Sequence, residues 1–108
     1  MDRLMEQCKE LNLMIIESEE YRKYIFARNS IKSNEDLYSA VVDFKRRYED
    51  VMKYTEGNPY DDILKIYYEN DDLLHNAVVS EYLRAESTLS KLIRRVMSEI
   101  TNGIKFDD

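Results

Sequence analysis

The residues of this chain that could do chemistry are few, and the first candidates surround its one histidine. His75 follows Asp71 and Asp72 in the stretch DDLLH. A metal site needs more ligands at fixed spacing, and this stretch matches no common metal-binding pattern. We therefore interpret His75 as an exposed polar residue at a helix junction and predict no metal ligand.

Three pairs of adjacent carboxylates are of a type that can act in general acid–base catalysis. They are Glu19–Glu20, Asp61–Asp62 and Asp71–Asp72, and each lies near the expected start of a helix. Negative charge in a first turn compensates the helix dipole, which accounts for all three pairs. Acid–base chemistry would require a cleft and raised pKa values, and the sequence indicates neither. We predict no catalytic residue and no enzymatic activity.

The chain has one cysteine, Cys8, which excludes an internal disulfide and favours a reducing compartment. Cys8 falls on the apolar side of the first expected helix, where the default is a small buried side chain. The sequence contains no glycine-rich phosphate loop, no Gly-x-Ser-x-Gly and no CxxC. No cofactor is predicted.

Length and charge limit the possible classes of protein. The 108 residues suit a single domain, 1–108, and the formal net charge is −6. An acidic surface repels DNA phosphates and anionic headgroups, so neither DNA nor a membrane is an expected partner. No signal peptide is visible, and the longest apolar run, residues 13–16, cannot span a bilayer. We expect a cytoplasmic protein.

Apolar residues recur every three or four positions along most of the chain, which predicts an all-α fold. We expect a bundle of four to five helices. They cover about residues 3–17, from residue 19 to the KSNED stretch, from there to TEGNPY, 59–69 and 77–101. Whether the last two are separate or form one bent rod stays open, because the ENDD stretch only weakens the pattern.

Helix ends are predicted from residues that cap them. Ser18 suits the N-cap of the second helix, and Ser33 with Asp36 resembles a capping box for the third. Gly57 can end the third helix in the left-handed conformation, and Asn58 can cap the fourth.

The last helix, at 25 residues, would be about 38 Å long. A compact domain of this size has a radius of gyration of only about 13 Å, so apolar turns would overhang it. We therefore predict a homo-oligomer, a dimer or higher, in preference to a monomeric bundle. The predicted self or partner interface is formed by apolar residues of the first and last helices: Leu4, Leu11, Ile15, Tyr82, Leu89, Leu92, Ile93, Val96 and Ile100.

Tyrosine and basic residues supply further candidate contacts. Nine tyrosines and no tryptophan are present, and Tyr54, Tyr60 and Tyr68 are the best candidates for exposed contacts. Tyrosines on apolar stripes are expected to be structural: Tyr21, Tyr24, Tyr48 and Tyr82.

Two basic clusters have different interpretations. Residues 45–47 have acidic neighbours and are typical of a solvated mixed-charge face. Lys91, Arg94 and Arg95 lie on the polar side of the last helix and form a possible charged contact face. An acidic partner or RNA phosphates within a larger complex would both fit it, and whether any RNA contact is direct stays open.

Two segments resemble the YlbF/YmcA family of bacterial regulators: ESEEYRKYIFARNSIKSNEDLYSAVVDFKRRYEDV and HNAVVSEYLRAESTLSKLIRRVMSEI. The resemblance covers about residues 4–102, and Ala77 stands where the family usually has proline. The matched positions are Ser18, Tyr21, Tyr24, Phe44, Asn76, Val79, Tyr82, Leu83, Ala85 and Glu86.

The resemblance implies a cytoplasmic, all-helical, oligomer-forming adaptor without a catalytic site. Members of the family influence competence, sporulation and biofilm formation in Gram-positive bacteria. The best-known members form a complex with a further partner protein and influence messenger-RNA processing by ribonuclease Y. Some resemble iron–sulfur proteins through C-terminal cysteines, which this chain lacks in TNGIKFDD. The alternative from the residues is a homo-oligomeric helical structural protein with no regulatory partner.

Overall fold

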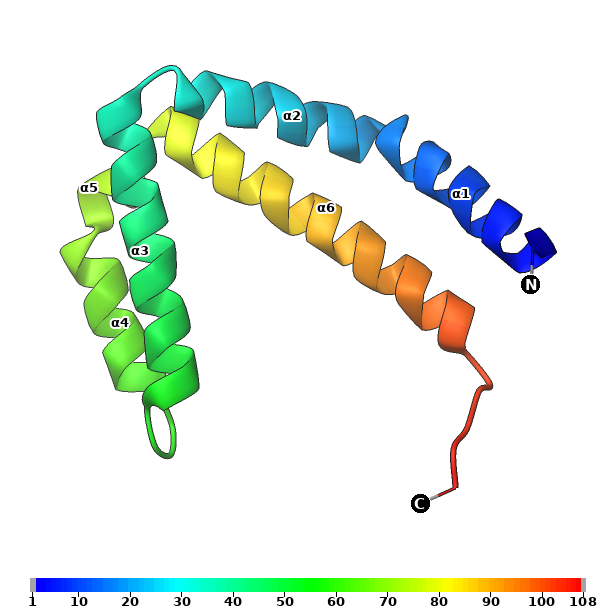
Figure 1. Ribbon diagram of the computed structural model, residues 1–108. Coiled ribbons are helices and arrows are strands. Elements are labelled where there is room, and N and C mark those ends of the chain that lie inside the picture. Colours follow the sequence, from blue (N-terminus) through cyan, green and yellow to red (C-terminus); the bar gives the residue numbers. More distant parts are fainter. Residues whose placement is uncertain (1, 108) are drawn as a thin grey trace. The chain divides into compact units, whose positions relative to one another are not determined.

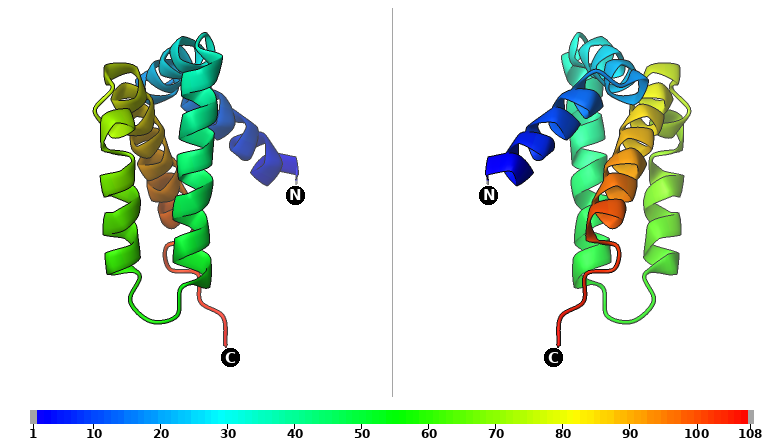
Figure 2. Two further views of the ribbon diagram at one scale, coloured as in Figure 1. Left: turned by 90° about the vertical axis from the view of Figure 1, so that its left-hand side faces the viewer. Right: turned by 90° about the vertical axis from the view of Figure 1, so that its right-hand side faces the viewer.

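A computed structural model describes residues 2–107, and its described part is helical without any strand. The prediction of an all-α protein is therefore confirmed. Figures 1 and 2 show the helices, which include the expected long C-terminal one; the short α5 is additional to the four to five that were expected. Their bounds are α1 Asp2–Ile16, α2 Glu19–Lys32, α3 Glu35–Tyr54, α4 Tyr60–Glu69, α5 Asp71–Leu74 and α6 Ala77–Thr101.

The chain forms two compact units. Unit 1 contains the chain up to Phe26 and from Arg84 onward, and unit 2 contains residues 27–83. The boundaries fall inside α2 and α6, so each of these helices contributes a part to both units. Unit 2 holds α3, α4 and α5, while unit 1 holds α1.

Unit 2 contains most of the fully buried side chains. Val41 and Phe44 of α3 are 0% and 5% exposed, and Ile66 of α4 is 5% exposed. The rings of Phe44 and Tyr67 stack with centroids 5.9 Å apart, which joins α3 to α4. The loop between Tyr54 and Tyr60 reverses the chain, and Gly57 in it has a φ of 77°. The result is an antiparallel helical hairpin.

The N-cap prediction for α2 is confirmed, and the one for α3 is wrong. The Tyr21 N–H donates to the Ser18 hydroxyl oxygen at 3.2 Å. At α3 the cap is Asn34, whose Oδ1 accepts from the Leu37 N–H at 3.1 Å. The Ser33 hydroxyl instead donates to the Ser30 carbonyl at 2.6 Å, so it belongs to the end of α2.

The helix α4 starts at Tyr60, one residue later than expected, and Asn58 Oδ1 accepts from its N–H at 3.0 Å. Asn70 caps the C-terminal end of the helix, and its side-chain amide donates to the Ile66 carbonyl at 2.8 Å. An asparagine that bonds to the backbone in this way competes with the regular helical pattern. The ENDD stretch therefore separates α4 from the short α5.

Asn76 caps the N-terminus of α6. Its Oδ1 accepts from the N–H groups of Val78 and Val79 at 2.9 and 3.2 Å. The helix then runs to Thr101, and Gly103, with a φ of 84°, follows its end.

Replacing the observed cap tests the assignment at α3. Asn34→Ala should lower the free energy of unfolding by about 1 kcal/mol, because the Leu37 N–H loses its acceptor. Ser33→Ala is the matched control and should change it by less than about 0.5 kcal/mol. Urea unfolding followed by circular dichroism measures both. A larger loss for Ser33→Ala than for Asn34→Ala would contradict the assignment.

Candidate functional site

His75 lies at the end of α5 with its side chain 78% exposed. Its Nδ1 is 2.8 Å from the Asp71 carbonyl oxygen and 3.3 Å from Asp71 Oδ1. The interpretation as an exposed residue at a helix junction is confirmed. Among residues 2–107, no group of three His, Cys, Asp or Glu is placed to hold a metal ion.

The carboxylate pairs stand in the first turns of helices, as expected. Glu19–Glu20 begin α2, Asp61–Asp62 begin α4 and Asp71–Asp72 begin α5. Each lies where the exposed N–H groups of a helix start favour negative charge. Their placement agrees with the interpretation that they compensate the helix ends.

The expectation that Cys8 is buried is wrong. Its thiol is exposed, and no residue of α1 from Asp2 to Ile16 is buried. The periodic pattern correctly places Cys8 on an apolar side of the helix. On that side Leu11 and Ile15 are half-buried, while Leu4 and Cys8 are exposed, so an apolar position does not bury the thiol.

The apolar stripe of α1 is partly exposed. Leu4 is 60% exposed, and Leu11 and Ile15 on the same side are half-buried. Positions 4, 8, 11 and 15 share one side of a helix because they are spaced by three or four residues. We call these four residues, Leu4, Cys8, Leu11 and Ile15, the α1 stripe.

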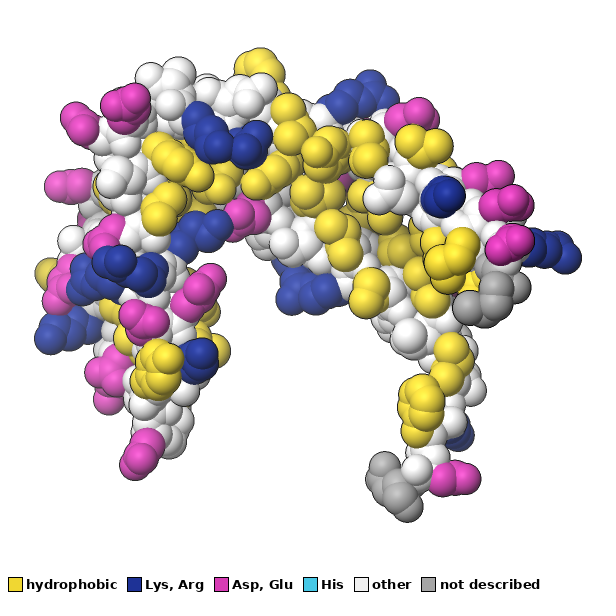
Figure 3. Space-filling model, viewed as in Figure 1, with side chains coloured by type: hydrophobic (Ala, Val, Ile, Leu, Met, Phe, Trp, Pro, Cys, Tyr) yellow, Lys and Arg dark blue, Asp and Glu magenta, His cyan; other side chains and the backbone are white. Residues whose placement is uncertain are grey.

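The apolar stripe of α6 becomes more exposed toward its C-terminus. Tyr82 and Leu89 are 5% and 9% exposed, so the chain itself already covers them. Beyond Leu89, Ile93 is 40% and Ile100 54% exposed. The part beyond Leu89, here called the α6 stripe, consists of Leu92, Ile93, Val96 and Ile100. Figure 3 shows hydrophobic side chains gathered over α1, the start of α2 and this part of α6.

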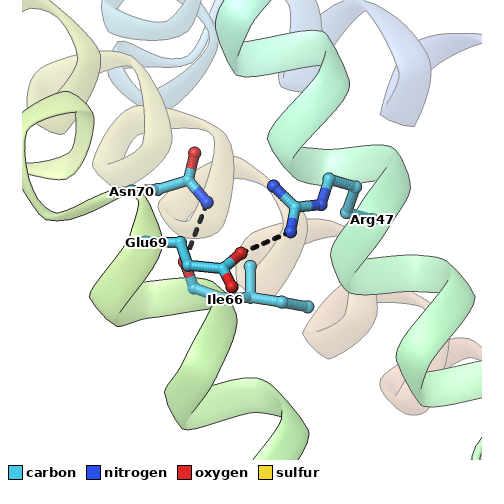
Figure 4. A network of polar contacts seen from close by, with 4 residues as sticks. All are labelled: Arg47, Ile66, Glu69 and Asn70. Atoms are coloured by element: carbon cyan, nitrogen blue, oxygen red, sulfur yellow. Dashed lines mark hydrogen bonds and ion pairs between the residues drawn. The ribbon is translucent and has the colours of Figure 1, made fainter.

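The basic residues fall into the two predicted groups. Lys91, Arg94 and Arg95 are exposed on α6, on the side away from the α6 stripe, and remain a possible contact face. The other group is partly structural. Arg47 Nη2 on α3 lies 2.6 Å from Glu69 Oε2 on α4 (Figure 4). Both side chains are about two-fifths exposed, so this pair contributes at most about 1 kcal/mol.

A shallow hollow lies beside this ion pair, between α3 and α4. Its volume is about 330 Å³, and the charged groups around Ile66 come from Arg47, Asp50, Asp62, Lys65 and Glu69. Arg47 and Glu69, on opposite sides of the hollow, pair with each other.

A second exposed apolar surface lies on α4 in unit 2. Tyr60, Leu64 and Tyr68 are 61%, 46% and 87% exposed and are spaced by four residues along one side of the helix. We call these three residues the α4 face. Tyr60 and Tyr68, as well as Tyr54, are exposed as predicted. Leu64 was missed as a contact residue, although its spacing from the two tyrosines was a usable signal.

Tyr67 joins the α4 face to the core of the hairpin. Its ring is 43% exposed and stacks on Phe44 and on Tyr48, the latter at 6.2 Å between centroids. Partial burial raises the pKa of its phenol above the ordinary value of 10.0, and repulsion from Tyr48 and a hydrogen bond between the two phenols raise it further. The Tyr67 phenol is therefore neutral at physiological pH.

A family model described as "Control of competence regulator ComK, YlbF/YmcA" matches residues 4–105. The chain belongs to this family. A UPF0342 protein from Caldicellulosiruptor bescii is 28% identical to it over 102 residues, which are 92% of this chain and 86% of that protein. No solved structure matches the chain.

Membership of the YlbF/YmcA family confirms the resemblance drawn from the sequence and supports a regulatory role. The family is described by the control of a regulator, and its description names no reaction. Among the described residues, no helix is long and apolar enough to cross a membrane.

The raised pKa of Tyr67 predicts an effect on stability at alkaline pH. The stabilisation from its neutral phenol is complete below the unfolded-state pKa of about 10 and is lost as pH rises through the higher folded-state pKa. Tyr67→Phe should therefore make stability fall less steeply above pH 10, and it should remove a phenol of raised pKa from the ultraviolet titration. Tyr68→Phe is the control, because the Tyr68 side chain is 87% exposed. Equal effects of the two changes would contradict this assignment.

Proposed function

We propose that this protein is a non-catalytic regulatory adaptor that self-associates through the α1 and α6 stripes and acts by protein–protein contact. The observation that carries the proposal is the absence of any buried residue in α1, Asp2–Ile16. An isolated helix of this length is marginally stable in water, so an uncovered amphipathic helix needs a partner surface. Burial of each large aliphatic side chain contributes roughly 1.5–3 kcal/mol.

A second copy of the chain is the occupant that charge favours. The α1 helix carries three carboxylates and two cations, a net charge of −1. The part of α6 from Arg84 to Thr101 carries four cations and two carboxylates, a net charge of +2. Packing α1 of one copy against α6 of another brings together two apolar stripes on helical segments of opposite net charge. Symmetric dimers are the commonest oligomers.

The regulatory partners proposed here follow from the family. Its members modulate competence, sporulation, biofilm formation and ribonuclease Y-dependent messenger-RNA processing. We therefore expect sister family members and a ribonuclease complex as partners, in the cytoplasm. The predicted interface residues Tyr82 and Leu89 are covered within the chain, and the exposed Leu4, Ile93 and Ile100 are the ones available for contact.

Placing charge on the stripes tests self-association. Leu4→Asp and Ile100→Asp should reduce the native mass to that of one chain, because each buries a carboxylate at the interface. Both residues are more than half exposed in the single chain, so its folding should be preserved. Ser98→Asp is the control, since it adds the same charge on the opposite, exposed side of α6. Sedimentation equilibrium measures the mass, and a single-chain mass for the unchanged protein would contradict the proposal.

Cys8 supplies a second readout of the same contact. Its thiol lies on the α1 stripe and is exposed in the single chain, so self-association should cover it. Its reaction with a thiol reagent should slow as protein concentration rises and should become fast and concentration-independent in Leu4→Asp. A rate that is the same at all concentrations in the unchanged protein would count against α1 as the interface.

The adaptor role is tested by co-purification with a tagged chain from the native host at moderate salt. We expect a second family member or a ribonuclease among the recovered proteins, identified by mass spectrometry. Recovery of untagged copies of this chain alone would instead support a homo-oligomeric structural protein without a regulatory partner.

A further inference from the structure

The α4 face is an apolar surface that the hairpin does not use for its own packing. The buried contact of α4 is made by Ile66, 5% exposed, on another side of the helix. Tyr60, Leu64 and Tyr68 add little to that core, and Tyr68 keeps 87% of its surface exposed. Aromatic residues are enriched at protein–protein interfaces, and a row of apolar side chains along one side of a helix is typical of helix-mediated contacts.

The segment around this face is strongly acidic. Residues 60–74 contain five carboxylates and one lysine, a net charge of −4 with His75 outside the segment. Glu69 is paired with Arg47, and Asp71 lies next to His75. Asp61 and Asp72 have no ion-pair partner among residues 2–107, so their charge is available to a partner molecule.

The tyrosine rings of this face are also available to cations. Elsewhere in the chain, three lysines lie over tyrosine rings, at 5.4 Å for Tyr38, 5.6 Å for Tyr82 and 5.3 Å for Tyr54. Within the described residues, neither Tyr60 nor Tyr68 has a cation over its ring. A lysine or arginine from outside could take that place and gain a cation–π contact.

We propose that the α4 face binds a cationic amphipathic helix of a partner protein. Its apolar side covers Leu64 and the two rings, and its lysines or arginines meet Asp61 and Asp72. A second copy of the same face is disfavoured, because a symmetric contact would bring two segments of charge −4 together. This inference deepens the proposed adaptor function by naming the chemistry of the regulatory partner.

A synthetic helical peptide of leucine and lysine, with leucines along one side, is the probe. Its binding to the full chain is followed by fluorescence anisotropy. We expect saturable binding that weakens by about tenfold or more in the double variant Tyr60→Ser, Tyr68→Ser. Tyr54→Ser is the matched control, because Tyr54 is 70% exposed but lies on α3. Circular dichroism verifies that each variant keeps its helices.

Two further peptides separate the contributions of charge and apolar contact. A leucine–glutamate peptide of the same pattern should not bind. A scrambled leucine–lysine peptide without an apolar side should bind weakly, and the tyrosine changes should not alter its affinity. Equal binding of the glutamate peptide, or unchanged affinity in the double tyrosine variant, would overturn the proposal. A lower native mass in that variant would also overturn it, since the face would then serve self-association.

The two proposals fail in different ways. Leu4→Asp and Ile100→Asp lie in unit 1 and should leave peptide affinity unchanged while lowering the native mass. A single-chain mass in the unchanged protein, with peptide binding that depends on Tyr60 and Tyr68, would reject self-association and retain the α4 face. Peptide binding that is lost in Leu4→Asp but kept in the double tyrosine variant would place the peptide on the α1 stripe and reject the α4 face.

Discussion

The feature on which the functional interpretation depends is an amphipathic helix that its own chain does not bury. The α1 helix is fifteen residues long, carries an apolar stripe and contains no buried residue. Backbone hydrogen bonds alone leave a helix of this length marginal in water. Most helical stability in proteins comes from covering an apolar side, and we propose that a second copy of the chain covers this one. The C-terminal part of α6, in the same unit, also has exposed apolar side chains.

The two units differ in the net charge of the helical segments that carry their exposed apolar side chains. In unit 1 the α1 and α6 segments carry small charges of opposite sign, which permits close approach of two copies. In unit 2 the exposed tyrosines of α4 stand in a segment of net charge −4. A chain built in this way can assemble with itself through one surface and keep another for a cationic partner.

Much of the fold follows from periodicity and capping chemistry in the sequence. Ser18 caps α2 as predicted, and α6 has the predicted bounds, because single strong signals mark those ends. At the start of α3, Ser33 and Asn34 are adjacent and both suit an N-cap. The choice of Asn34 depends on the Ser33 hydroxyl being held by the Ser30 carbonyl, which local sequence does not determine.

The extent of burial could not be predicted in the same way. Periodicity shows that Leu89 and Ile100 share a stripe, but not that the chain covers the first and leaves the second exposed. The same limit explains the error at Cys8, whose side of α1 is apolar but uncovered. Coverage depends on which helices pack together in three dimensions. The exposed tyrosines were predicted correctly because Tyr54, Tyr60 and Tyr68 are off the main stripes.

Hydrogen exchange of the α1 backbone amides, measured over a range of protein concentrations, tests most directly whether another copy covers this helix. If self-association stabilises α1, its amides should exchange slowly at high concentration and progressively faster on dilution, while those of the α3–α4 hairpin stay protected. Protection of α1 that is unchanged on dilution to a single-chain mass would show that the chain stabilises α1 by itself. That result would contradict the central claim.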